Sequence, residues 1–189
     1  FETLRYDSDN GFFLLDRHLE RLASSAQYFG FMFDRARVLG ALSDAVEGVQ
    51  KGSNRVRLVL TRTGQMKVET APLEKAEEGR VFRTRISGDP IDSRDPLLFH
   101  KTTHREPYTS RLHSDCDEVI LVNERGEVTE CTIGNLVVEL DGKRVTPPIP
   151  CGLLGGTFRA ELLDNNELIE QVLTVDDLKC ADALYMINS

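Results

Sequence analysis

Lys101 has the surroundings that best suit a lysine to covalent chemistry. It follows directly on the apolar run Leu97–Phe99 and on His100. Partial burial lowers the pKa of a lysine and makes its neutral amine available for Schiff-base formation. The five other lysines lie in or beside polar turns and stretches: Lys51, Lys67, Lys75, Lys143 and Lys179. The alternative for Lys101 is a surface lysine that extends its ammonium group into water.

A glycine pair, Gly155 and Gly156, leads into a helix that the sequence predicts over residues 158–163. Exposed N–H groups and the helix dipole at such a start favour a phosphate, and glycine lets the backbone approach the anion closely. The segment lacks the Lys-Ser or Lys-Thr of a nucleotide-binding P-loop. A plain glycine turn before a helix would have the same pattern.

Two charged residues could complete a site for a phosphorylated ring compound. Glu130 ends a short predicted strand, where its carboxylate could hydrogen-bond a protonated ring nitrogen. Arg21 projects from a predicted helix and could clamp a phosphate. The simpler interpretations are a solvated acid at a strand end for Glu130 and a surface arginine for Arg21, beside Arg17 and Glu20 at helical spacing.

Hydrophobic periodicity and turn residues predict the elements that must position these groups. In the first half a strand is followed by two helices, the second capped by Asp34, and then by a hairpin and one further alternating segment. The expected ranges are strand 1–6, helix 14–29, helix 35–46, and strands 55–61, 66–70 and 81–86, with a polar, solvated stretch at 74–79.

The second half is richer in strands. Asp141-Gly142 is a hairpin turn, and Pro147 ends the pairing because proline cannot donate to a ladder. Thr174 or Asp176 caps a short segment before the last strand. The expected strands are 118–122, 127–129, 134–140, 168–173 and 183–187.

Residues 87–96 form the best linker candidate because they are polar and hold two prolines and a glycine. The sequence therefore predicts an α+β, mixed α/β chain of two lobes. The N-terminal lobe would span residues 1–86 and the C-terminal lobe residues 97–189. Phe1 enters in mid-strand, so we expect the chain to have been cut from a longer one at both ends.

Composition narrows the function classes. The 189 residues carry a net charge of −8, and such an acidic chain has no overall field that attracts nucleic acid or a membrane surface. No apolar run reaches the roughly 18–20 residues that span a bilayer, and no signal-peptide pattern opens the chain. We therefore expect a cytoplasmic protein.

The cysteines and histidines give no metal-ligand spacing. We expect the four cysteines to be buried thiols in a reducing compartment, with disulfides as the alternative. The residues concerned are Cys116, Cys131, Cys151 and Cys180, and the scattered His18, His100, His104 and His113.

Five segments together resemble the class IV, fold-type IV pyridoxal-phosphate enzymes, in the same order and over essentially the whole chain. This family contains branched-chain aminotransferases, D-amino-acid aminotransferases and aminodeoxychorismate lyases. The segments are 1–5 with 15–22, 100–105, 128–135, 146–159 and 181–189. The Lys-Thr-Thr-His-Arg run from Lys101 is most similar to the aminodeoxychorismate lyases, including those fused behind aminodeoxychorismate synthase.

The resemblance implies a small sheet-plus-helices lobe, a larger barrel-like lobe and the cofactor pyridoxal 5′-phosphate. Lys101 would carry the cofactor as a Schiff base and shuttle protons, and Glu130 would bind the pyridine nitrogen. Arg57 and Tyr108 would contact the substrate, and Asn135 would be structural. The residues implied in phosphate binding are Arg21, Gly156, Thr157, Phe158, Asn188 and Ser189.

The resemblance further implies a lyase that converts 4-amino-4-deoxychorismate to 4-aminobenzoate, a folate precursor, and pyruvate. An aminotransferase acting on branched-chain or D-amino acids is the alternative, because fold and cofactor residues alone do not fix the substrate. A cofactor-free scaffold is a third interpretation. The implied assembly is a homodimer, with aminodeoxychorismate synthase as a fusion or partner.

Overall fold

The computed structural model describes residues 1–73 and 80–189, so the polar stretch predicted at 74–79 lies outside the described residues. The chain divides into two units, Phe1–Glu78 together with Ser189, and Gly79–Asn188. Each unit has a sheet and an apolar core of its own, which confirms the predicted mixed α/β class with two lobes. None of the helices within the described ranges is long and apolar enough to cross a membrane.

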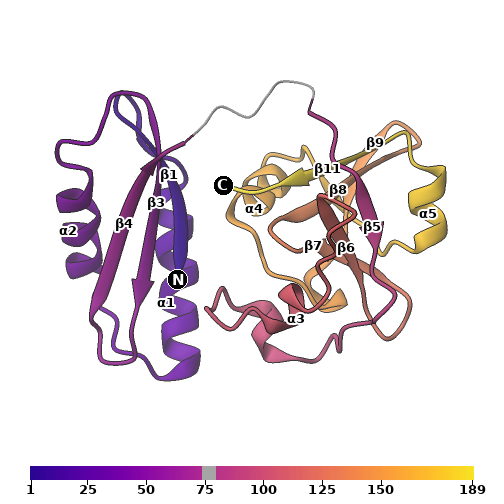
Figure 1. Ribbon diagram of the computed structural model, residues 1–189, viewed down its shortest axis with the longest axis horizontal. Helices are drawn as coiled ribbons and strands as arrows, with labels where there is room; N and C mark the ends of the chain where they lie inside the picture. The colour runs from indigo at the N-terminus through magenta and orange to yellow at the C-terminus, as the bar shows by residue number, and fades with distance from the viewer. Residues whose placement is uncertain (74–79) are drawn as a thin grey trace. The chain divides into compact units, whose positions relative to one another are not determined.

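The first unit is a four-stranded antiparallel sheet in the order β2-β1-β3-β4 with two helices (Figure 1). Leucines and valines from both helices pack on alternate residues of β1 and β3, so the helices cover one face of the sheet. The elements are β1 Glu2–Asp7, β2 Gly11–Phe12, α1 Leu15–Phe29, α2 Arg35–Val46, β3 Ser53–Leu60 and β4 Met66–Pro72.

Local sequence signals define the ends of these helices. Gly30 ends α1 with a left-handed φ of 66°, which glycine adopts without steric cost. The predicted cap of α2 is confirmed, because Asp34 Oδ1 accepts the N–H of Ala36 at 2.9 Å and that of Arg37 at 3.2 Å. The chain therefore turns sharply between α1 and α2.

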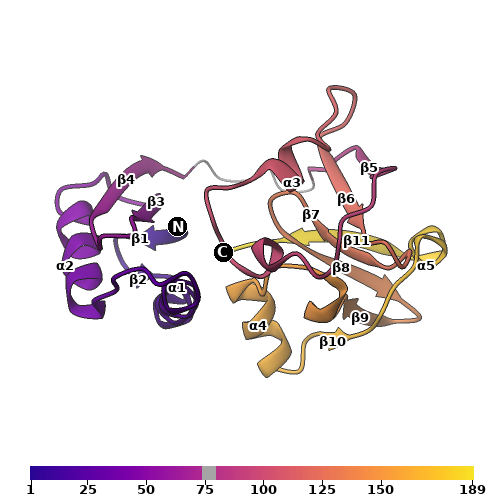
Figure 2. The same cartoon turned by 90° about the horizontal axis from the view of Figure 1, so that it is seen from below.

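The second unit is built around a larger sheet with the path β10-β9-β8-β7-β6-β5, in which β11 also pairs with β8 (Figure 2). A buried apolar cluster that includes Val128, Val138 and Leu173 forms its core. Its elements are β5 Thr84–Ile86, η1 Pro96–Phe99, α3 Glu106–Thr109, β6 Glu118–Val122, β7 Val128–Cys131, β8 Asn135–Leu140, β9 Lys143–Thr146, η2 Ile149–Cys151, α4 Thr157–Asp164, β10 Ile169–Glu170, α5 Val175–Cys180 and β11 Ala183–Ile187.

The boundary between the units lies earlier than the sequence suggested. Strand β5 pairs in parallel with β6, and so belongs to the second sheet. Residues 87–96 are no linker either: Ile91 is 4% exposed and bridges to Asn123, and the Ser93 N–H donates to Glu124 at 2.8 Å. Burial of apolar side chains outweighs the polar, proline-containing composition of this stretch.

Other predicted elements are shorter than expected. The strand expected at 168–173 narrows to β10, and Thr174 rather than Asp176 caps α5, with Asp177 completing a capping box. All four cysteines are free thiols, but only Cys131 and Cys151 are buried. The expectation of buried thiols is therefore wrong for the exposed Cys180.

Candidate functional site

Glu130 is a buried acid of the second unit. It lies on β7 with only 4% of its surface exposed. Its Oε1 accepts hydrogen bonds from the Tyr108 hydroxyl at 2.9 Å and from the Leu154 N–H at 3.1 Å. Its Oε2 accepts one from Asn135 Nδ2 at 3.1 Å. Three separate segments of the chain thus orient one carboxylate.

Burial raises the pKa of Glu130 from 4.5 to about 7, because a carboxylate loses its hydration inside the protein. The Leu154 and Tyr108 hydrogen bonds and the positive charges of Lys101 and Arg105 oppose that rise without cancelling it. The direct partners of the carboxylate are neutral donors. Glu130 can therefore both hold and release a proton near neutral pH.

Tyr108 is itself held in place. It lies on α3, is 8% exposed, and its ring is 4.4 Å from the Arg105 guanidinium in a cation–π contact. Arg105 Nη2 also donates to the carbonyl of Thr132. Burial and the neighbouring Glu130 raise the pKa of Tyr108 far above its usual range, so its hydroxyl stays a donor.

Lys101 follows η1 and is half-buried. The 3-10 helix that precedes it is capped by Asp95 and anchored by Leu98, which is 1% exposed. The positive charge of Lys101 lowers the pKa of Glu130, so these two residues interact electrostatically. The apolar run identified in the sequence is therefore the anchor that sets where the lysine emerges.

The glycine pair leads into α4 as predicted, with Gly156 as its N-cap and Thr157 as its first residue. Thr157 is 4% exposed, and Phe158 is half-buried. The Oδ1 of Asn135 lies where a side chain on Gly156 would begin. The N-terminus of α4 is thus placed beside the residue that also contacts Glu130.

Buried side chains fix the loop between β9 and α4 by donating hydrogen bonds to its backbone carbonyls. Arg159 Nη2 donates to the carbonyl of Pro147 at 2.7 Å, and Asn123 Nδ2 to that of Cys151 at 2.9 Å. Asn135 Nδ2 donates to the carbonyl of Leu154 at 2.8 Å. These hydrogen bonds from three side chains give the loop a defined shape.

Asn188 follows β11, which pairs with β8 so that Ile187 lies opposite Asn135. Its Nδ2 donates to the carbonyl of Ile133 at 3.4 Å, and its side chain is exposed. Ser189 is the next residue and is half-buried. The last strand thus ends next in register to the start of β8.

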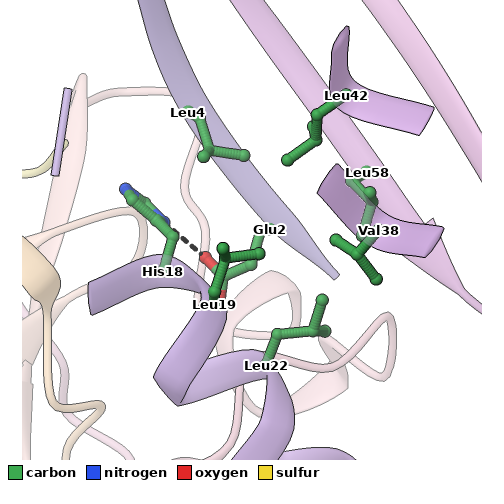
Figure 3. Close-up of a pocket in the computed structure, with 8 residues that line it drawn as sticks. All are labelled: Glu2, Leu4, His18, Leu19, Leu22, Val38, Leu42 and Leu58. Atoms are coloured by element: carbon green, nitrogen blue, oxygen red, sulfur yellow. Dashed lines mark hydrogen bonds and ion pairs between the residues drawn. The ribbon is translucent and has the colours of Figure 1, made fainter. Parts of the chain in front are cut away.

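In the first unit, Arg21 is tied to a buried acid that the sequence analysis missed. Its Nε donates to Glu2 Oε1 at 2.9 Å and its Nη2 to Glu2 Oε2 at 2.6 Å. His18 Nδ1 lies 2.8 Å from Glu2 Oε2 (Figure 3). Burial would raise the pKa of Glu2, but Arg21 and His18 outweigh it and lower the pKa to about 2.

A signal for this cluster was present in the sequence. Glu2 lies two residues before Leu4 and so shares the buried face of β1. His18 lies three residues after Leu15, on the apolar stripe of α1. Arg57, by contrast, lies on β3 with its guanidinium 4.2 Å from the Phe1 ring.

Residues 1–189 match the family model described as amino-transferase class IV. A protein of Schizosaccharomyces pombe named "Putative aminodeoxychorismate lyase" is 30% identical, over 100% of this chain and 84% of its own length. The crystal structure of a "Putative amino-acid aminotransferase" from Mesorhizobium loti has a TM-score of 0.92 at 41% identity, covering 99% of this chain and 92% of that one. The 4-amino-4-deoxychorismate lyase of Pseudomonas aeruginosa shares the fold, with a TM-score of 0.79 at 20% identity over 100% and 78% of the two chains.

Proposed function

The chain belongs to the class IV amino-transferase family, and on that premise we propose that it is a pyridoxal 5′-phosphate-dependent lyase. Its substrate would be 4-amino-4-deoxychorismate, and its products 4-aminobenzoate, a folate precursor, and pyruvate. The observation that carries the proposal is the buried Glu130, held by neutral donors with its pKa near 7. The likeness to the S. pombe protein, which extends over all of this chain, favours the lyase reaction.

The residues of the second unit fit a phosphorylated pyridine. A pyridine nitrogen needs an acid that stays buried and takes or holds a proton near pH 7, which describes Glu130. A phosphate needs backbone N–H groups at a helix start, which the Gly156–Phe158 turn of α4 would supply. Lys101 is half-buried and within electrostatic reach of Glu130, as a covalent anchor must be. We propose Asn188 and Ser189 as further phosphate ligands.

Arg21 is also proposed as a phosphate ligand. Glu2 holds its guanidinium in one orientation through two hydrogen bonds, and a pre-oriented guanidinium loses less entropy when it binds an anion. Arg57 is proposed to meet the substrate carboxylate.

When bound, pyridoxal 5′-phosphate supplies an electron sink for the carbon that carries the substrate amine. The Lys101 amine takes the proton from C4 of the substrate and can return it to the departing group. The C3–O bond to the enolpyruvyl group then breaks, the ring becomes aromatic and the enolpyruvyl group leaves as pyruvate. The Glu130 carboxylate would hold a proton on the pyridine nitrogen, while Tyr108 and Asn135 hold the carboxylate in position.

An aminotransferase acting on branched-chain or D-amino acids is the second candidate. The observation that favours it is the M. loti structure, which carries an aminotransferase name at 41% identity. The same lysine and acid would serve both reactions, since both begin with removal of a proton from the carbon beside the amine. A homodimer forms part of either proposal, and analytical ultracentrifugation would detect it.

The test compares two lysine variants of the second unit. Lys179 forms an exposed ion pair with Asp176 at 2.8 Å, so K179A is a matched control for K101A. Pyridoxal 5′-phosphate should give a visible absorption band that borohydride fixes on residue 101, in the wild type and K179A but not in K101A. A label elsewhere would overturn the role of Lys101.

The reaction is then assigned from its products. Release of pyruvate from 4-amino-4-deoxychorismate by the wild type and K179A is the expected result. Glutamate-dependent amination of keto acids without pyruvate release would overturn the lyase and establish the aminotransferase.

A further inference from the structure

Asn135 joins two parts of the second unit that the proposed function uses separately. It lies at the start of β8 and is 5% exposed. Its Nδ2 donates both to Glu130 Oε2 at 3.1 Å and to the carbonyl of Leu154 at 2.8 Å. One buried amide group therefore spans the carboxylate and the loop that leads into α4.

The loop itself completes the connection. The N–H of Leu154 donates to Glu130 Oε1 at 3.1 Å. The carboxylate, the Asn135 amide and both polar groups of Leu154 thus form a closed set of three hydrogen bonds. Hydrogen bonds in a buried network reinforce one another, so a shift of the loop must shift the carboxylate.

Gly156 meets the same amide from the other side. Its φ of −66° suits any residue, so backbone conformation does not demand glycine there. A Cβ at this position would collide with Asn135 Oδ1 and lie 3.2 Å from its Cγ. A Cβ on Gly155 would meet Ile149 Cδ1 at an ordinary 3.4 Å. Asn135 is therefore the reason why position 156 needs glycine, whereas position 155 has room for alanine.

We propose that Asn135 is a positioning residue that couples the acid at the cofactor ring to the loop that receives the cofactor phosphate. The inference rests on the proposed function, because the ligands of Glu130 and of the loop are assigned there. It goes beyond the structural role that the sequence suggested for Asn135. Its consequence is that recognition of the ring and recognition of the phosphate depend on one another.

Asn123 provides a matched control in the same unit. Its Nδ2 also bridges a carboxylate and a backbone carbonyl, those of Glu127 at 2.7 Å and Cys151 at 2.9 Å. It is 1% exposed. N123A therefore removes a comparable buried amide that contacts the same loop, but it removes none of the contacts to Glu130.

The first measurement is binding of pyridoxal 5′-phosphate and of pyridoxal to the apoprotein, followed by absorbance. The dissociation constant of pyridoxal divided by that of pyridoxal 5′-phosphate measures how much affinity the phosphate adds. N135A should weaken pyridoxal 5′-phosphate binding by about tenfold and lower that ratio by at least about threefold, since a hydrogen bond to a charged group is lost. N123A should leave the ratio within about twofold. Equal ratios in N135A and N123A would overturn the coupling.

The second measurement needs no cofactor. The carboxyl carbon of Glu130, assigned with E130Q, is titrated by NMR in the apoprotein. N135A should raise the midpoint because it removes a donor to the charged form, whereas N123A should not. The groups that face Glu130 in both variants are unchanged: Lys101, Arg105, Tyr108 and Cys131. An equal shift in both variants contradicts the proposal, whether or not any cofactor binds.

If N135A does not fold, G156A tests the same contact between Asn135 and the loop. It should displace the amide and shift the Glu130 midpoint as N135A does, while G155A should not. In the N135A background, G156A should add no further shift, because the colliding amide is gone. Additive shifts would show that Gly156 acts independently of Asn135. If neither the wild type nor any variant bound pyridoxal 5′-phosphate, the proposed function would be wrong. The titrations would still test whether Asn135 couples Glu130 to the loop.

Discussion

Glu2 in the first unit and Glu130 in the second are both almost completely buried, and these two acids have opposite chemistry. Glu2 is 2% exposed and Glu130 is 4% exposed. Burial alone raises the pKa of both. Arg21 and His18 then lower the pKa of Glu2 to about 2, whereas the neutral donors around Glu130 and more distant charges leave its pKa near 7.

The difference shows that partners, not depth, decide what a buried acid does. Glu2 stays charged because two basic side chains contact it directly, so it serves to orient Arg21. Glu130 is held by a phenol, an amide and a peptide N–H, none of which brings a full charge. The protonation state of Glu130 can therefore change when a charged ligand binds beside it. Four experiments test this contrast.

The largest effect should come from E130Q. The amide keeps the size of the side chain but cannot hold a proton at a ring nitrogen, so kcat/KM should fall by about 10³-fold. Because the amide carries no charge, the free energy of unfolding at pH 7 should rise by up to about 3 kcal/mol, the part that the wild type loses as its carboxyl group ionises. Turnover and urea unfolding measure the two. Wild-type turnover in E130Q would show that the Glu130 carboxyl group is not needed for the reaction.

E2Q should act mainly on stability. The change leaves the Arg21 guanidinium without the charge that compensates it, and removing one partner of a buried ion pair costs about 3–5 kcal/mol. Urea unfolding at pH 7 measures the loss. The control is E20Q on the exposed face of α1, which should be nearly neutral. A small effect of E2Q would mean that the Glu2 charge is not needed.

The pH dependence of apoprotein stability should have two limbs. The pKa of Glu130 is raised from 4.5 to about 7, so its folded form holds a proton that the unfolded chain releases, and stability falls by up to about 3 kcal/mol as pH rises through this window. The pKa of Glu2 is lowered to about 2, so its stabilisation is present above pH 4.5 and is lost, by a similar amount, as pH falls toward 2.

Each limb has its own control. Urea unfolding across pH should show that E130Q removes the upper limb and E2Q the lower one. Persistence of the upper limb in E130Q would assign it to another group and weaken the contrast.

Y108F should have the smallest effect. It removes one donor to Glu130 Oε1 while retaining the ring under Arg105, so it should cost about 1 kcal/mol of stability and raise the pKa of Glu130 further. NMR titration measures that shift. A changed KM with an unshifted Glu130 would instead support the substrate contact that the resemblance implied for Tyr108.

The sequence by itself determined the local elements and the order of the chemical groups. Alternation predicted strand β3, and Asp34 and Gly30 marked helix ends, because these features depend on a few neighbouring residues. Five matched segments were enough to predict the family, which the family model confirms. The roles of Lys101, Glu130 and Arg21 stay predictions.

Only the tertiary structure decided which groups meet and what charge they carry. Glu2 reaches Arg21 across 19 positions, Tyr108 reaches Glu130 across 22, and the Leu154 N–H reaches it across 24. These contacts between residues far apart in the sequence depend on strand register and packing, which no local sequence pattern determines. A pKa depends on lost hydration and on such partners, so the opposite behaviour of the two acids, and the double contact of Asn135, could be seen only in the folded chain.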